Sequence, residues 1–348
     1  ILFVEFLMLP ASFLTLAFPF VAKAYVWLAT FFEQLTHWFA SIDTWITLGI
    51  AGEFYVTLFF LAFFLFCANF QNERKRMTYF VLFSMLLAFI SFPTTILTKV
   101  MIFDVGQGDA ILVDDPKCRI LIDTGPPDSY DALIGYLLDR NIRYIDYLVI
   151  THNHDDHYGE ISDITDVVEI GAIVTGSDPP AAFDGLLMIV KEGDVIGRDG
   201  LMLTVISANN DNSDENDNSL VLYGTIGSDT WLFMGDAGIN IENNILRKYL
   251  LFPDVVKVGH HGSDSASSNA FIQAMSPQYA IVSVGKNGYG LPDENVLIRW
   301  EDSGSTLLNT KTDGTVEFVY FPLAKHPLVI TYKKRQPWFC QMSFFFDL

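Results

Sequence analysis

The heptapeptide THNHDDH at residues 151–157 directly follows the apolar run Tyr147–Ile150, which is typical of a buried strand. A loop at the end of a strand can turn three histidines and one aspartate toward a single point. Imidazole together with carboxylate suits zinc, manganese or iron, whereas calcium prefers oxygen ligands alone. A solvated polar loop is the alternative interpretation. The sequence favours a metal site, with these expected ligands: His152, His154, Asp156 and His157.

Two other strand ends carry residues of the same chemical type. Asp236 follows the run 230–234, where its carboxylate could bridge two cations, and His260-His261 follow the run 255–259. Either pair alone is weak evidence, because a Gly-Asp pair after a strand is more often a turn. Five of the seven histidines nevertheless fall in these two clusters. All three strand ends together therefore predict one metal centre.

The order of these elements is similar to that of the metallo-β-lactamase superfamily. Four further motifs resemble the C-terminal domain of the competence channel family ComEC across about residues 99–322: DVGQGDA from Asp104, LIDTG at 121–125, DNSLVL at 217–222 and KVGHHGS at 257–263. The resemblance implies an α/β fold, a four-layer αβ/βα sandwich, preceded by transmembrane helices. It also implies a hydrolase with two divalent metal ions, zinc or manganese.

By the family pattern, one metal would be held by His152, His154 and Asp236. The second would be held by Asp156, His157, Asp236 and either His260 or His261, and Asp156 and Asp236 would be the catalytic carboxylates. No histidine occurs between His157 and His260, so a third histidine ligand of the family is absent. Water, substrate phosphate or Asn218 would take its place. Residues expected to support the ligands or to contact phosphate are Asp104, Asp109, Asp123, Asn218, Ser219, Lys257 and Ser263. For Lys257, a side chain that points into solvent is an equal alternative.

Composition divides the chain into two parts. Hydrophobic residues make up 51% and aromatic residues 14%, with the excess at the start of the chain. Residues 1–98 hold five acids and four bases, a net charge of −1, so −19 of the total of −20 belongs to residues 99–348. This division predicts a membrane portion at 1–98 and a hydrolase domain at 99–322. The residues 323–348 form a basic and aromatic tail.

Within the membrane portion, the segments 54–70 and 77–97 are nearly unbroken apolar runs, each close to the ~20 residues that cross a bilayer as a helix. Residues 1–22 are a third expected span, and 24–49 is an aromatic-rich stretch that suits an interfacial helix, or a helix packed on other membrane helices. The start at Ile1 suggests a fragment of a longer protein. The basic connector 72–76 is expected to stay cytoplasmic. The chain would then be a multi-pass cell-membrane protein with its metal domain outside the cytoplasm.

Strands and helices alternate in the second part, as in layered α/β folds. A helix is expected at Tyr130–Asn141, because Leu133, Tyr136 and Leu137 recur at helical spacing. Strands are expected at 100–103, 110–113, 119–122, 147–150, 201–206, 220–223, 230–234, 255–258, 279–284 and 315–320.

The metal-site pattern and what the ComEC resemblance implies together lead to one functional hypothesis. The chain would be a metal-dependent phosphodiesterase or nuclease domain of a DNA-uptake channel, in which a metal-activated hydroxide hydrolyses DNA outside the membrane. Its partners would be DNA, either single-stranded or the non-imported strand, the lipid bilayer, the upstream channel portion and other DNA-uptake proteins. A non-catalytic docking or gating module is one alternative, and a hydrolase of a cell-wall phosphoester or lactone is another. The strongly negative domain argues against tight binding of nucleic acid.

Overall fold

The computed structural model describes residues 53–69, 71–90, 97–127, 129–177, 185–208, 214–332 and 343–345, with single positions between 15 and 34. The chain divides into two units, Ile1–Thr47 and Leu48–Leu348. In the first unit, the positions described between 22 and 34 are helical. The span expected at 1–22 and most of the interfacial helix expected at 24–49 lie outside the described residues.

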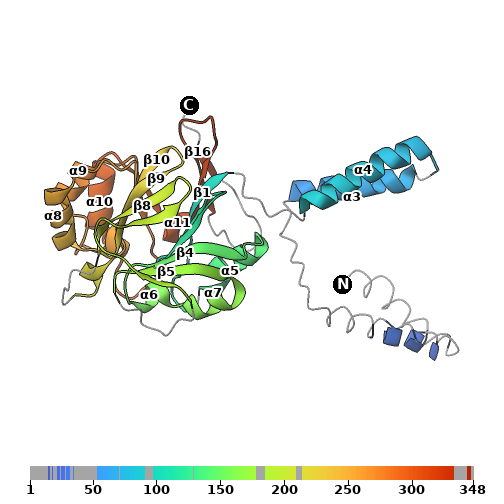
Figure 1. Ribbon diagram of the computed structural model, residues 1–348, viewed down its shortest axis with the longest axis horizontal. Coiled ribbons are helices and arrows are strands. Elements are labelled where there is room, and N and C mark those ends of the chain that lie inside the picture. The colour runs from blue at the N-terminus through green and yellow to red at the C-terminus, as the bar shows by residue number, and fades with distance from the viewer. Residues whose placement is uncertain are drawn as a thin grey trace. The chain divides into compact units, whose positions relative to one another are not determined.

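Two helices form where the membrane spans 54–70 and 77–97 were expected. α3 (Glu53–Ala68) and α4 (Glu73–Ile90) are joined by a short turn and lie side by side (Figure 1). The rings of Phe63 and Phe83 are 5.6 Å apart, and those of Phe66 and Phe80 are 6.0 Å apart. None of the helices in the described residues combines the length and the apolarity that crossing a bilayer requires. The membrane spans therefore remain a prediction.

The remainder of the second unit contains two large sheets. The first has nine strands in the order β16 (Ser343–Phe345), β15 (Leu328–Tyr332), β14 (Thr315–Tyr320), β1 (Thr98–Ile102), β2 (Ile111–Asp114), β3 (Arg119–Ile122), β4 (Tyr144–Ile150), β5 (Glu169–Thr175) and β6 (Leu187–Ile189). The second has seven, in the order β13 (Thr306–Asn309), β12 (Tyr279–Val282), β11 (Val255–Lys257), β10 (Asp229–Phe233), β9 (Val221–Ile226), β8 (Leu201–Ser207) and β7 (Val195–Arg198).

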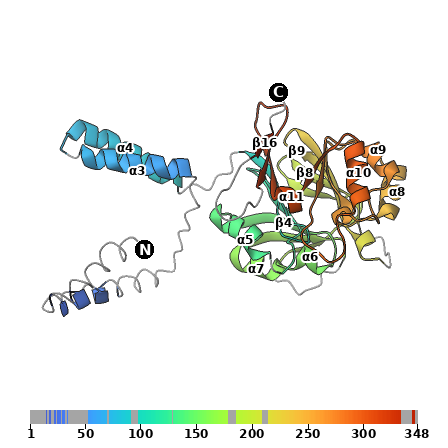
Figure 2. The same ribbon diagram turned by 180° about the vertical axis from the view of Figure 1, so that it is seen from behind.

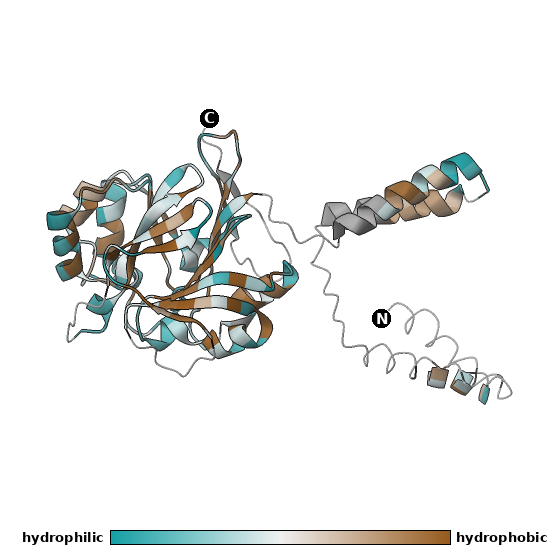
Figure 3. Ribbon diagram, in the orientation of Figure 1, coloured by the Kyte–Doolittle hydropathy of each residue, from teal (hydrophilic) through white to brown (hydrophobic). Residues whose placement is uncertain are grey.

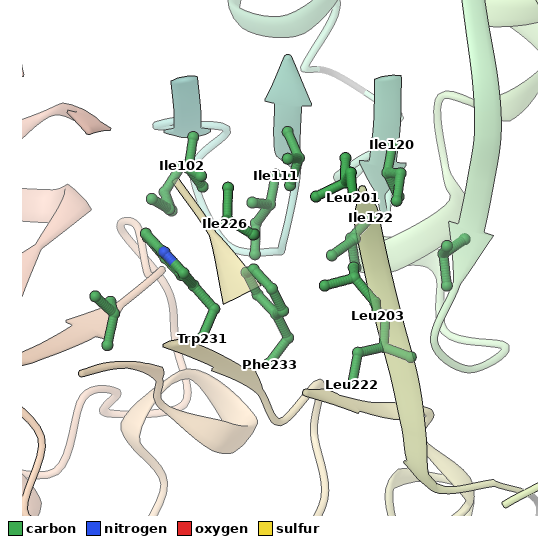
Figure 4. Close-up of a cluster of buried hydrophobic side chains, with 14 of the residues drawn as sticks. Ile102, Ile111, Ile120, Ile122, Leu201, Leu203, Leu222, Ile226, Trp231 and Phe233 are labelled. Atoms are coloured by element: carbon green, nitrogen blue, oxygen red, sulfur yellow. The ribbon is translucent and has the colours of Figure 1, made fainter. Parts of the chain in front are cut away.

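The central core lies between the two sheets. Side chains of a strand alternate between its faces, so Val100 and Ile102 of β1 enter this core, whereas Met101 and Phe103 enter a separate outer cluster. Trp231 and Phe233 of β10 meet the isoleucines of the first sheet, as Figure 4 shows. The Trp231 Nε1–H donates to the Tyr320 hydroxyl at 2.8 Å, which satisfies the buried indole.

Helices cover the outer face of each sheet. α5 (Tyr130–Asp139) and α7 (Ile161–Val167) pack on the first sheet, and α8 (Ile239–Lys248), α9 (Asn269–Met275) and α10 (Glu294–Asp302) pack on the second (Figures 1 and 2). The strands are mostly hydrophobic, and hydrophilic residues gather on outer helices such as α8 (Figure 3). This order of layers is the αβ/βα sandwich that the sequence motifs predicted.

The strand register brings the polar loops to one edge. β3 and β4 are parallel, with Ile122 opposite Val149, so Asp123 and Thr151 emerge together. β10 and β11 are also parallel, with Phe233 opposite Lys257, which places the loop at Asp236 beside the loop at His260-His261. Carboxyl ends of parallel strands are where α/β sheets commonly bind ligands.

The ten expected strands and the expected helix form within a few residues of their predicted bounds, but six of the described strands were not expected: β5, β6, β7, β13, β15 and β16. β15 is the most instructive, because it lies in the segment interpreted as a tail beginning at residue 323. It pairs antiparallel with β14, Phe318 opposite Val329, so the sheet continues to Tyr332. The short run Leu328–Tyr332 gains its backbone partners from β14 on one side and from β16 on the other.

Candidate metal centre

His157 is fixed by a buried carboxylate. It lies in the short helix α6 (Asp155–Tyr158), and its Nδ1 is 2.8 Å from Oδ2 of Asp123. Asp123 is itself held by Thr151, whose backbone N–H donates to Oδ1 and whose hydroxyl donates to Oδ2, each at 2.8 Å. Because the carboxylate accepts a hydrogen bond from Nδ1–H, Nε2 of the neutral His157 ring is left with a free lone pair for another partner.

Asp236 occupies the turn between β10 and α8. Its backbone N–H donates to the Ser219 hydroxyl at 3.1 Å, and two residues on, Gly238 N–H donates to Asp217 Oδ1 at 3.1 Å. Asp217 also accepts from the Asn240 amide at 3.1 Å. The segment Asp217–Ser219 thus orients the loop that carries Asp236.

His261 lies in the 3-10 turn η4 (Gly259–Gly262), where His260 and His261 have φ angles of 49° and 52°. Left-handed backbone at two consecutive non-glycine residues is uncommon and is a recognised feature of functional sites. The turn points the two rings differently. His261 is buried and its Nδ1 is 2.9 Å from the Ser283 carbonyl oxygen, whereas His260 is partly exposed and bonds the Ser265 hydroxyl at 2.8 Å. The structure therefore brings His261, not His260, into the cluster.

Three imidazoles converge around the Oδ2 atom of Asp236. The distances to it are 3.4 Å from His157 Nε2, 3.4 Å from His261 Nε2 and 3.9 Å from His152 Nε2. Asp156 Oδ2 lies 3.3 Å from His261 Nε2. Several overlapping groups of three residues could each hold one ion. Two of them are His152, His157 and Asp236, and Asp156, His157 and His261.

The buried polar atoms at this point fit a cation. His157 Nε2, His261 Nε2 and Asp236 Oδ1 are shielded from solvent and have no hydrogen-bond partner. Buried polar groups without a partner are rare in folded proteins, since each costs about 1–3 kcal/mol. Imidazole nitrogens and carboxylate oxygens with free lone pairs are the donors that divalent transition metals take.

The electrostatics of the cluster are strongly coupled. Burial, followed by the nearby His157, lowers the pKa of His152 to about 2, so this imidazole is neutral. Burial works in the opposite direction at His261, but Asp236 and Asp156 together raise its pKa to about 10. Asp236 has a pKa well below its ordinary value, because His261 and His157 outweigh the effect of burial. The cluster thus favours a positive charge beside Asp236.

The other expected site residues lie around this cluster or on the neighbouring loops. His154 caps the start of α6, with Nδ1 3.0 Å from His152 Nε2. Asp104 is half-buried, with its backbone N–H donating to Thr315. Ser263 bonds Ser265, and Asn218 ends the 3-10 turn η3 (Asn216–Asn218).

The structure excludes one of the two alternatives for Lys257. A side chain pointing into solvent is wrong, because Lys257 is fully buried and its ammonium lies 2.7 Å from Asp109 Oδ2. β11 is a central parallel strand covered on both faces, so none of its residues reaches solvent.

Three residues that support the metal ligands were not predicted from the sequence: Thr151, Asp217 and Ser283. Thr151 and Asp217 stand directly beside expected site residues, and this adjacency was the available signal. Ser283 contributes only a backbone carbonyl oxygen, for which the sequence carries no signal.

The chain is similar in sequence to several known proteins. The chain is 32% identical over 258 residues to ComE operon protein 3 of Bacillus subtilis, an alignment that covers 64% of this chain and 33% of that protein. It is 31% identical over 224 residues to competence protein ComA of Neisseria gonorrhoeae, covering 63% of this chain and 32% of that protein. The chain thus spans about a third of the length of these curated relatives, which agree with the ComEC family resemblance of its motifs.

Among solved structures, the metallo-beta-lactamase fold protein YhfI of Bacillus subtilis matches with a TM-score of 0.45 and 12% identity, over 64% of this chain and 99% of that one. The family model described as the metallo-beta-lactamase superfamily matches residues 103–286, more than half of the chain. The chain belongs to the metallo-beta-lactamase superfamily.

Proposed function

We propose that this chain is the metal-dependent phosphodiesterase, a nuclease, of a DNA-uptake membrane channel. One observation carries the proposal: His157 Nε2, His261 Nε2 and Asp236 Oδ1 are buried, have no hydrogen-bond partner, and belong to a cluster no wider than a metal site. The superfamily has a metal-dependent hydrolase fold, which supports a catalytic rather than a purely structural use of that cluster.

The cluster divides between two cations. We assign His152, His154 and Asp236 to the first, and Asp156, His157 and His261 to the second. Asp236 then bridges, since its Oδ2 lies within 3.9 Å of His152 and 3.4 Å of both His157 and His261. The ions would be zinc or manganese.

Two divalent cations in this place would supply a hydroxide nucleophile near neutral pH and neutralise charge on the phosphoryl oxygens. The protein's part is to hold the ligands rigidly. Asp123 and Thr151 fix the His157 ring, the Ser283 carbonyl oxygen fixes His261, and Ser219 fixes the backbone of Asp236. Such supporting contacts usually change metal affinity by about 10–100-fold.

The relatives' names indicate the biological setting. One relative is named a competence protein, and we propose DNA, in the form of the strand that is not imported, as the substrate. The net charge of −19 on residues 99–348 opposes tight binding, which suits a transient substrate. We further propose that 54–70 and 77–97 anchor the chain in the cell membrane, with the metal domain outside the cytoplasm. Its partners would be the upstream channel portion and other DNA-uptake proteins.

Two other functions also have support. A docking or gating module without catalysis is favoured by the acidic surface and by the absent third histidine. A hydrolase of another ester, such as a cell-wall phosphoester or lactone, is favoured because this fold does not fix its substrate.

The test is degradation of end-labelled single-stranded DNA by the full chain in detergent, after metal removal and addition of Mn²⁺ or Zn²⁺. Asp156→Ala is the inactive variant, and Asp302→Ala, an exposed carboxylate on α10, is the matched control. We expect cleavage that needs metal, persists in the control and is lost in Asp156→Ala. Intact DNA with folded, metal-loaded protein would reject the nuclease and favour the docking module or another ester.

A further inference from the structure

Asp109, the last residue of the DVGQGD loop, carries a buried carboxylate of which only one oxygen is used. Its Oδ2 accepts from the Lys257 ammonium at 2.7 Å, and Lys257 also donates to the Val258 carbonyl oxygen at 2.9 Å. The other oxygen, Oδ1, is shielded from solvent and has no hydrogen-bond partner. The nearest nitrogen of His261, Nδ1, is 3.6 Å away, which is too long for a hydrogen bond.

Asp109 belongs to the metal cluster. One ligand-type atom each from Asp109, Asp236 and His261 forms a group in which all three lie within 4.8 Å of one another. Asp109 is 1% exposed, so water reaches it no better than it reaches Asp236. Lys257 pairs with Oδ2, but Oδ1 remains a buried acceptor without a hydrogen-bond donor, which is costly unless another positive partner is present.

The backbone holds Asp109 in this place. Its N–H donates to the Asp156 carbonyl oxygen at 3.1 Å, which ties the DVGQGD loop to the HNHDDH loop. Gly108 makes the approach possible, since a Cβ there would lie 2.3 Å from the same carbonyl oxygen. Asp109 therefore joins the loop of Asp156 to the strand that leads to His261.

We propose that Asp109 is a further metal ligand, with Oδ1 coordinating the ion shared by Asp236 and His261 while Lys257 restrains Oδ2. That ion then has three carboxylates, from Asp109, Asp156 and Asp236, beside its imidazoles. Carboxylate-rich sites suit manganese, whereas imidazole-rich sites suit zinc. Asp109 thus shifts the metal preference of this position toward manganese. The inference rests on the proposed metal centre, but it does not depend on the substrate.

The test compares Lys257→Met with Lys257→Met/Asp109→Asn in the full chain. The Asp109–Lys257 ion pair is absent from both proteins, so they differ only in a carboxylate or its isosteric amide at residue 109. Dissociation constants for Mn²⁺ and Zn²⁺ are measured by chelator competition, and thermal unfolding of the metal-free proteins verifies that both fold. We expect the double variant to bind Mn²⁺ about 10–100-fold more weakly than Lys257→Met, with a smaller loss for Zn²⁺.

Two results would overturn the proposal. Equal Mn²⁺ affinities would mean that Asp109 serves only to neutralise Lys257. Equal losses for Mn²⁺ and Zn²⁺ would mean that Asp109 acts through its charge alone, because both ions carry the same charge.

If either variant does not fold, anomalous diffraction from Mn²⁺-loaded wild-type crystals decides the question. Asp109 Oδ1 at about 2.2 Å from a manganese ion supports the proposal, and Oδ1 outside the coordination sphere refutes it. Failure of the nuclease assay would leave these metal measurements unaffected, so the two proposals fail separately.

Discussion

The imidazole Nδ1 of His157 lies 2.8 Å from Oδ2 of Asp123, and both side chains are buried. Asp123 itself has a left-handed backbone, with φ at 58°, so its position is imposed by the surrounding structure. The pair is the means by which the first sheet fixes the ring that faces Asp236.

Asp123→Asn should weaken binding of divalent metal. The amide keeps the volume, but it cannot hold the Nδ1 proton of His157 as a carboxylate does, so Nε2 is no longer reliably the lone-pair nitrogen. We expect affinity for Mn²⁺ or Zn²⁺ to fall by about 10–100-fold, measured by chelator competition. Asp302→Asn on α10 is the control, and the same loss in both variants would contradict this role.

Glu242→Gln should weaken the attachment of α8 to α9 on the outer face of the second sheet. The Glu242 carboxylate, in α8, accepts from the backbone N–H groups of Ser267 and Ser268 at the start of α9. An amide would direct its own donors toward one of these N–H groups and leave it unsatisfied. We expect the free energy of unfolding in urea to fall by about 1–3 kcal/mol. Glu301→Gln, which is exposed on α10, should stay within about 0.5 kcal/mol of wild type.

Leu203→Ala and Met202→Ala test the core between the sheets. These neighbours on β8 point to opposite faces: Leu203 is fully buried in the central core, and Met202 is 55% exposed. We expect Leu203→Ala to lower the free energy of unfolding by about 2–5 kcal/mol. Met202→Ala should change it by no more than about 0.5 kcal/mol. Similar losses at both positions would be inconsistent with this arrangement of the sheets.

The thiol of Cys118 should be unreactive in the folded protein. Burial, followed by the charge of Asp146, raises its pKa to about 11, so at pH 8 nearly all of it is the protonated thiol. In a Cys67→Ser/Cys340→Ser background, iodoacetamide should label Cys118 slowly in buffer and rapidly in urea, as followed by mass spectrometry. Equal rates in the two conditions would show that Cys118 is accessible.

Several features of the site could be predicted from the sequence because they are local. The HNHDDH loop and the Gly-Asp turn each follow an apolar run directly, and a strand end fixes where such residues emerge. The choice between His260 and His261 could not be made, since both stand next to each other and only the left-handed backbone of η4 separates their directions. Asp109 and Lys257 are 148 residues apart, so their ion pair follows from the packing of two sheets.

Hydrolysis of a phosphodiester by the metal-loaded site is the central claim. The most direct measurement is turnover of bis(p-nitrophenyl) phosphate by the metal-stripped full chain during titration with Mn²⁺, with bound metal determined in parallel and Asp236→Asn as the comparison. We expect turnover to rise with bound metal and to be absent from the variant. A wild-type chain that binds metal at this site and releases no p-nitrophenol would contradict the account.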